Sequence, residues 1–189
     1  MSKVSLKNRR LAAENSKWRV YLDHIADAGG NEVADYLVIA GHHPAPGDVT
    51  GVAVLPVIDG NFLLLRSYRH GLGRDIWEIP RGFIDSQETP ATAALRELGE
   101  ETNLRCAAED MVPLGHYAPE PATMAARGAL FAATRCAGTL KKATDEIGLD
   151  GLHVFTPDAM AKLIASGEIE DAGTLIAYYR YRALTQPNG

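Results

Sequence analysis

The first part of the chain alternates between apolar and polar residues. Over residues 18–26 the alternation has a period of two, with one slip near the end. A period of two places each kind of residue on its own face of a strand, so this segment predicts a half-buried β-strand. Gly29-Gly30-Asn31 tolerates positive φ angles, and it predicts a hairpin into a second strand over residues 33–39.

Past residue 47, continuous apolar runs replace the alternation. The runs 52–58 and 62–65 are separated by Asp59-Gly60-Asn61, which is a second hairpin signal. Further strands are expected near residues 112–117, 129–134 and 152–155.

Helical spacing first appears over residues 90–102. Pro90 suits the first turn of a helix, and Thr89 can cap it. Two more helices are predicted over residues 157–165 and 171–184. Because strands come early and helices come late, we predict an α+β fold with a mixed sheet.

A loop rich in Pro and Gly, residues 41–47, marks a candidate boundary. We predict an N-terminal tail and hairpin over residues 1–46 and a main domain over residues 47–189. The basic start, residues 1–11, has no apolar core for secretion and predicts a short mobile tail. Because a lone hairpin is too small to be stable, we expect it to pair across the subunits of a homodimer.

Composition and charge exclude several classes of protein. Among 189 residues, 19 Lys and Arg stand against 24 Asp and Glu, which gives a net charge of -5 and argues against binding nucleic acid. No apolar run approaches about 18 residues, so no membrane span is expected. Cys106 and Cys136 lie far apart and in no Cys-x-x-Cys frame. They favour the reducing cytoplasm over a disulfide framework or a zinc site.

Three carboxylates, those of Glu97, Glu100 and Glu101, stand at i, i+3 and i+4 of the first predicted helix. Helical geometry projects them to one side, where like charges repel by about a few tenths of a kcal/mol per pair. A bound cation would offset this repulsion, and an all-oxygen set favours Mg²⁺, with Mn²⁺ as a substitute. For such a triplet taken alone, the alternative is a solvated acidic face.

Neighbouring residues argue against a merely solvated acidic face. Arg96 immediately precedes Glu97, and Glu88 lies at the end of the preceding loop. An Arg among carboxylates can hold one of them by two hydrogen bonds and orient the others. Gly82 lets the backbone turn tightly and approach a ligand.

The segment from Gly82 to Leu104 resembles the Nudix box, Gly-x5-Glu-x7-Arg-Glu-U-x-Glu-Glu-x-Gly-U, in which U is a bulky aliphatic residue. The positions in register are Gly82, Glu88, Arg96, Glu97, Leu98, Glu100, Glu101 and Leu104. The final Gly of the pattern is Asn103 here. That position ends the helix, where a left-handed conformation is usual, and Asn suits it best after Gly.

Flanking segments resemble the ADP-ribose pyrophosphatase branch of the Nudix hydrolases. They are residues 64–70, 77–85 and 167–174, together with Pro119. The similarity spans roughly residues 18 to 184 and implies the Nudix fold, a mixed sheet between helices.

The resemblance implies a metal site. Glu97 and Glu101 would be the principal ligands, with Glu100 as a third ligand or one acting through water. The backbone carbonyl of Arg81 would complete the set, and Arg81 is also expected among the substrate-binding residues.

The resemblance implies roles for five further residues. Glu88 and Arg96 would form an orienting pair, and Glu146 on a late loop would help to bind metal or activate water. Arg69 matches a position that often contacts the substrate diphosphate. Trp18 matches an aromatic that often stacks on the base, with packing in the core or at a dimer contact as its alternative.

The implied activity is metal-dependent hydrolysis of the diphosphate linkage in a nucleoside diphosphate sugar. ADP-ribose is the first candidate, with AMP and ribose 5-phosphate as products. A GDP- or UDP-sugar is an alternative substrate, because the box reads the diphosphate and not the base. An alternative of another class is a Nudix-like module that senses a nucleotide without hydrolysing it.

Overall fold

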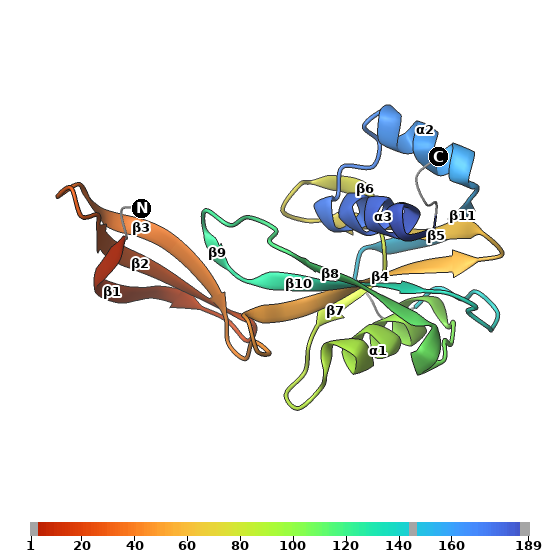
Figure 1. Ribbon diagram of the computed structural model, residues 1–189, viewed down its shortest axis with the longest axis horizontal. Helices are drawn as coiled ribbons and strands as arrows, with labels where there is room; N and C mark the ends of the chain where they lie inside the picture. Colours follow the sequence, from red (N-terminus) through yellow and green to blue (C-terminus); the bar gives the residue numbers. More distant parts are fainter. Residues whose placement is uncertain (1–3, 144–146, 186–189) are drawn as a thin grey trace. The chain divides into compact units, whose positions relative to one another are not determined.

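A computed structural model describes residues 4–143 and 147–185 of the chain. The chain divides into two compact units, the first made of residues 1–50 and 118–127, the second of residues 51–117 and 128–189. The elements (Figure 1) are β1 (Ser5–Glu14), β2 (Trp18–Ala26), β3 (Glu32–Gly41), β4 (Val49–Ile58), β5 (Asn61–Arg69), β6 (Arg74–Glu78), β7 (Arg81–Phe83), α1 (Pro90–Thr102), the 3₁₀ turn η1 (Ala108–Asp110), β8 (Met111–Tyr117), β9 (Met124–Ala125), β10 (Arg127–Ala133), β11 (Leu149–Phe155), α2 (Pro157–Ala165) and α3 (Ala172–Thr185).

The first unit takes in a segment that the sequence does not assign to it. We predicted a boundary after residue 46, whereas the compact units divide after residue 50. Residues 118–127 join the first unit because β9 pairs in parallel with β3, with Ile39 opposite Met124. The hydroxyl of Tyr36 also donates a hydrogen bond to the carbonyl of Ala122.

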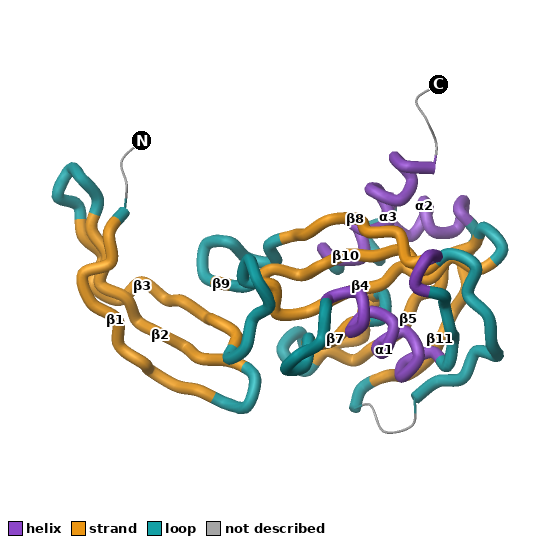
Figure 2. The backbone as a smooth tube through the Cα atoms, turned by 60° about the horizontal axis from the view of Figure 1, so that its bottom comes forward, coloured by secondary structure: helices purple, strands orange, loops and turns teal. Residues whose placement is uncertain are grey.

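The strands β1, β2 and β3 run side by side in an antiparallel arrangement (Figure 2). The predicted strand and hairpin are confirmed as β2 and β3, but the predicted mobile tail is wrong from Ser5 onward, where β1 begins. Every residue of β1 is exposed, so its sequence lacks the alternation of apolar and polar residues that would predict a strand. Backbone pairing with β2 and a two-bond ion pair between Arg9 and Asp23, at 2.8 and 2.7 Å, hold it instead.

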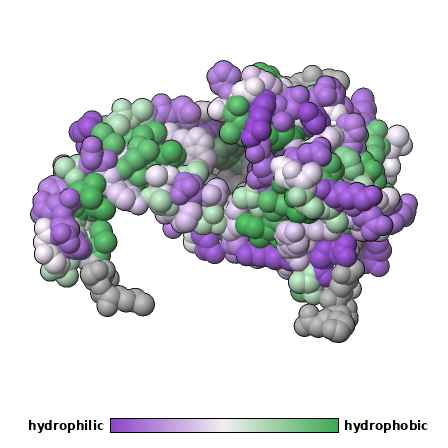
Figure 3. Space-filling model, turned by 90° about the horizontal axis from the view of Figure 1, so that it is seen from above, coloured by the Kyte–Doolittle hydropathy of each residue, from purple (hydrophilic) through white to green (hydrophobic). Residues whose placement is uncertain are grey.

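Apolar side chains remain on the surface of the first unit. The large exposed ones are Val4, Leu6, Leu11, Val33 and Leu37. Figure 3 shows apolar atoms among polar ones over this unit. The role of this unit in dimerisation stays a prediction.

The second unit contains the larger sheet. Among the described residues, this sheet has 7 strands in the order β11-β5-β4-β10-β8, with β6 paired to β5 and β7 paired to β4. Figure 1 shows α1 on one side of the sheet and α2 and α3 on the other. The predicted α+β class is confirmed, and no helix in the described part of the chain has the length and apolarity needed to cross a membrane.

The second hairpin is confirmed between β4 and β5. Val57 lies opposite Phe62 and Ile58 opposite Asn61, so a two-residue turn joins the strands. Asp59 and Gly60 occupy this turn at φ angles of 48° and 78°. Positive φ at both central residues matches the right-handed twist of the strands that the turn joins.

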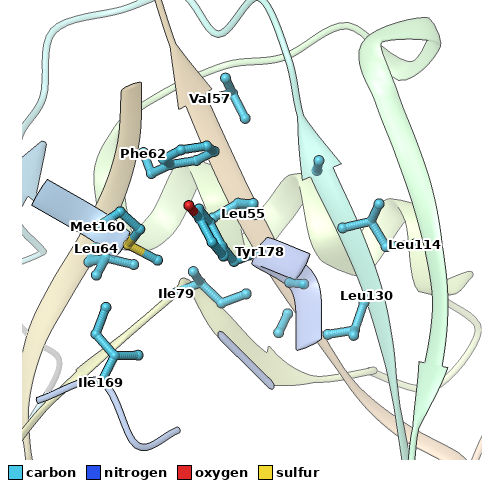
Figure 4. Close-up of a cluster of buried hydrophobic side chains, with 13 residues drawn as sticks. Leu55, Val57, Phe62, Leu64, Ile79, Leu114, Leu130, Met160, Ile169 and Tyr178 are labelled. Atoms are coloured by element: carbon cyan, nitrogen blue, oxygen red, sulfur yellow. The ribbon is translucent and has the colours of Figure 1, made fainter. Parts of the chain in front are cut away.

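The main apolar core lies between this sheet and the helices α2 and α3 (Figure 4). Phe62 of β5 contacts Tyr178 of α3 edge to face, with ring centroids 5.1 Å apart. Met160 of α2 and Leu55 of β4 have no exposed surface. The strands that carry the site are therefore anchored on a closely packed layer.

Helix α1 begins and ends where its sequence predicts. The side chain of Thr89 accepts a hydrogen bond from the backbone N–H of Thr92, and Pro90 opens the helix. Asn103 closes it in the left-handed conformation, at a φ of 62°. Its side-chain amide donates to the carbonyl of Thr139 at 2.8 Å, a contact that glycine at this position could not make.

Candidate functional site

The guanidinium of Arg96 joins helix α1 to the loop that precedes it. Its Nε and Nη2 donate to the two carboxylate oxygens of Glu88 at 2.9 and 3.0 Å, and Nη2 also donates to the carbonyl of Phe83 at 2.9 Å. Its Nη1 donates to Glu97 at 2.8 Å and to Glu100 at 3.0 Å. One side chain therefore positions three carboxylates, as the sequence predicts for an Arg in this place.

These contacts stabilise the ionised forms of Glu88 and Arg96. Hydrogen bonds from Arg96 are the largest cause that lowers the pKa of Glu88, with the backbone N–H of Asp85 contributing at 3.0 Å. The same bond to Glu88 raises the pKa of Arg96 further above its ordinary value. The orienting pair consequently keeps its charges throughout the neutral range.

Gly82 is required by the position of Glu97. A Cβ atom at residue 82 would lie 1.8 Å from Oε1 of Glu97 and 2.2 Å from its carboxyl carbon. Any side chain there would displace the carboxylate. Glu97 is 8% exposed, so its carboxylate is seated against the backbone of β7.

Glu101 shares the buried face of α1 with Glu97. One helical turn separates the two residues, and Glu101 is 4% exposed. Its Oε2 accepts a hydrogen bond from the backbone N–H of Arg81 at 3.1 Å. Glu100 differs, because its side chain is 59% exposed. The acidic triplet thus divides into two buried carboxylates facing β7 and one that faces outward and contacts Arg96.

The donor chemistry of the buried pair fits a hard divalent cation. Within residues 4–143 and 147–185, no group of three or more His, Cys, Asp or Glu side chains could hold a metal ion by itself. Mg²⁺ commonly takes one or two carboxylates and completes its shell with waters and substrate phosphates. Glu97 and Glu101 supply such a pair, and the parts predicted for Glu100 and for the carbonyl of Arg81 stay predictions.

A second polar cluster holds Arg81 from the other side of β7. Its Nη2 donates to the carboxylate of Asp171. That carboxylate also accepts from the backbone N–H and the hydroxyl of Thr174, both at 2.7 Å, at the beginning of α3. The hydroxyl of Thr174 in turn accepts from the backbone N–H of Ile79 at 3.1 Å. The start of α3 is therefore tied to the segment that carries Arg81.

The opposite charges in this cluster stabilise the ionised forms of Arg81 and Asp171. Burial alone would lower the pKa of Arg81, but the carboxylates of Asp171 and Glu78 raise it. Burial would raise the pKa of Asp171, but Arg81 and Thr174 lower it. The sequence places Asp171 at a helix start and within the flanking segment 167–174, but nothing in it links Asp171 to Arg81 some ninety positions earlier.

Arg69 pairs with a buried carboxylate. Its Nε donates to Glu78 at 3.1 Å, and its Nη2 forms a second bond to the same group. Glu78 is 2% exposed and also lies 3.6 Å from the Nε of Arg81. Arg69 and Arg81 were both expected from the sequence to bind substrate. Glu78, which contacts both of them, was not expected in the site.

The structure brings most of the predicted site residues together in the second unit. Contacts through β7 and α1 join Arg81, Glu88, Arg96, Glu97, Glu100 and Glu101. Trp18 lies half-buried at the start of β2 in the first unit, and its contact with a base stays a prediction. Glu146 lies outside the described residues.

Comparison with known proteins identifies relatives of this chain. Residues 48–175 match the model of the NUDIX domain. ADP-ribose pyrophosphatase of Bacillus subtilis is 31% identical over 127 residues, which are 67% of this chain and 68% of that protein. CMP-5'-(N-acetyl-N-hydroxy-3-aminopropyl)phosphonate hydrolase of Streptomyces rubellomurinus is 42% identical over 57 residues, and this match spans only 28% of its length.

A solved structure has the same fold. The crystal structure of an ADP compounds hydrolase superposes with a TM-score of 0.78, covering 96% of this chain and 94% of the other, at 19% identity. The fold predicted from the sequence is therefore confirmed.

The position of the Glu97 carboxylate predicts a strict requirement for glycine at residue 82. Because a Cβ at residue 82 overlaps the buried carboxylate, we expect Gly82→Ala to lower the free energy of unfolding by about 1–3 kcal/mol. Gly71→Ala is the matched control, since its Cβ would meet nothing within 4 Å. It should change stability by no more than about 0.5 kcal/mol. Urea denaturation measures both, and equal stabilities of the two variants would contradict the assignment.

The Arg81–Asp171 pair predicts a stability difference that depends on pH. The folded pKa of Asp171 lies below 3.8, so its ionised form stabilises the fold above that pH, and this contribution is lost as the pH falls through the folded pKa. Asp171→Asn keeps a residue that can cap α3 but removes the charge. We expect it to lower the free energy of unfolding at pH 7 by about 1.5–3 kcal/mol. In urea titrations the deficit should shrink below pH 3.8, and a deficit of constant size would refute the charge pairing.

Proposed function

The chain belongs to the NUDIX family and is a Nudix hydrolase, and on this premise we propose that it cleaves the diphosphate linkage of a nucleoside diphosphate sugar. ADP-ribose is the first candidate, with AMP and ribose 5-phosphate as products. The observation that carries the proposal is the buried pair of carboxylates, Glu97 and Glu101, held against the backbone of β7.

We propose that Glu97 and Glu101 hold a divalent cation, Mg²⁺ or Mn²⁺, with Glu100 and the carbonyl of Arg81 as further ligands. When bound, the cation neutralises the charge of the diphosphate and lowers the pKa of a water molecule. The support comes from the oxygen-only donor set and from the place of both carboxylates against the backbone of β7.

The chain's own side chains orient this site. Arg96 holds the carboxylate of Glu97 at 2.8 Å, and Glu88 fixes the guanidinium of Arg96 by two bonds. Glu97 is therefore kept in one orientation before substrate binds, which reduces the reorganisation needed during reaction. Removal of a proton from the attacking water is proposed for Glu146.

We propose that Arg69 and Arg81 bind the substrate. The side chain of Arg69 remains 37% exposed while its guanidinium contacts Glu78, and a cation in that position can attract a diphosphate. Trp18 is proposed to stack on the base. The relatives named above act on different nucleotides, so a GDP- or UDP-sugar remains the second candidate.

Assembly as a homodimer in the cytoplasm belongs to the same proposal. The exposed apolar side chains of β1 and β3 support pairing between two first units. Light scattering at micromolar concentration should give twice the mass of one chain, and a monomeric mass would contradict the dimer.

The activity is tested with purified protein, Mg²⁺ and a panel of ADP-, GDP- and UDP-sugars ranked by kcat/KM. We expect release of AMP from ADP-ribose and a fall of roughly a hundredfold or more in Glu101→Gln. Asp150→Asn is the matched control, since it removes an exposed carboxylate on β11. Its activity should be unchanged.

Two outcomes of this assay would overturn the proposal. One is full activity of Glu101→Gln, which would remove the carboxylate pair from the reaction. The other is no turnover with any sugar nucleotide or metal while a nucleotide still raises the Tm. That second outcome would favour a sensing module that does not hydrolyse its ligand.

A further inference from the structure

The two cysteines of the chain lie beside a short antiparallel bridge in the second unit. Arg105, just after α1, and Ala137, just after β10, exchange both of their backbone N–H···O hydrogen bonds, each 2.8 Å long. The next residues along this pairing are Cys106 on one segment and Cys136 on the other. They are about thirty positions apart in the sequence and opposite each other in the fold.

The geometry of such a pair suits a disulfide. Antiparallel pairs alternate between hydrogen-bonded and non-hydrogen-bonded positions, and Cα atoms at the latter are about 4.5 Å apart. Disulfides join Cα atoms separated by about 4.4–6.8 Å. The thiol of Cys106 donates to the carbonyl of Thr134 at 3.2 Å, so it points toward the segment that carries Cys136.

Backbone hydrogen bonds on both sides hold the two segments together. The backbone N–H of Lys141 donates to the carbonyl of Thr102 at 3.1 Å, on the side toward α1. Thr134 donates to the carbonyl of Asp110 at 3.0 Å, on the other side. Because both segments are tied at either end, a bond between the sulfur atoms requires little movement of the backbone.

We propose that Cys106 and Cys136 form a reversible intramolecular disulfide by exchange with a low-molecular-weight disulfide such as oxidised glutathione. The thiolate of Cys106 attacks one sulfur of glutathione disulfide and releases one glutathione. The thiolate of Cys136 then attacks the sulfur of Cys106 and releases the second glutathione. The two protons of the cysteines end on the two released thiols, so the protein loses two hydrogens and one glutathione disulfide is reduced.

Access and ionisation set the rate of this exchange. Both side chains are half-buried, which leaves them open to a small oxidant. Burial is the largest cause that raises the pKa of each thiol, to about 12 for Cys136. Because burial raises the pKa of both thiols, exchange should accelerate as the pH rises above 7.

The disulfide would fasten the end of α1, the helix that carries Glu97 and Glu101, to the segment that follows β10. It would close a loop of about thirty residues, which restricts the unfolded chain. We expect the oxidised form to melt about 5–10 °C above the reduced form.

The test uses the full chain, reduced with dithiothreitol, freed of it, and incubated in a glutathione buffer rich in the disulfide. After acid quenching, intact mass, peptide mapping without reductant and the Tm are measured. We expect a monomer that has lost two hydrogens, one pair of peptides joined through Cys106 and Cys136, and a rise in Tm that dithiothreitol reverses.

Cys106→Ser and Cys136→Ser are the matched variants. Each should take up a single glutathione and show no rise in Tm. Three results would overturn the proposal: two unmodified thiols in the wild type after equilibration, a disulfide between two chains, or a rise in Tm that either serine variant retains.

Discussion

The hydrogen bonds of one guanidinium, that of Arg96, are the contacts on which the rest of the site depends. Three carboxylates within one helical turn repel one another, and burial of Glu97 would be unfavourable without a cation at hand. Arg96 contacts Glu97 and Glu100 and is itself fixed by both oxygens of Glu88. The guanidinium therefore offsets the repulsion within the acidic helix and keeps the carboxylate of Glu97 oriented.

Strand β7 is the other half of this arrangement. It offers Gly82, where the missing side chain leaves room for Glu97, and the backbone N–H of Arg81, which binds Glu101. The strand is fixed by pairing with β4 and by the ion pair between Arg81 and Asp171 at the start of α3. Helix α1 and the three-residue strand β7 thus hold each other, and the start of α3 is tied to β7 through Asp171.

Local chemistry made much of this predictable. The cap at Thr89, the left-handed end at Asn103 and the spacing of the acids define α1 from sequence alone, since each is a contact between near neighbours. Strand β1 escaped prediction because all of its residues are exposed. The Arg81–Asp171 pair and the approach of Cys106 to Cys136 escaped it as well, because only the folded chain brings such distant positions together.

Arg96→Lys is the sharpest test of the role of this guanidinium, because lysine keeps the charge but cannot form the two-bond fork to Glu88. The measurement is kcat and KM with ADP-ribose and Mg²⁺, alongside the Tm. We expect a fall in kcat of at least about tenfold with a smaller change in KM, because Glu97 would lose its fixed orientation. A variant that keeps the wild-type kcat would show that the guanidinium of Arg96 does not organise the site.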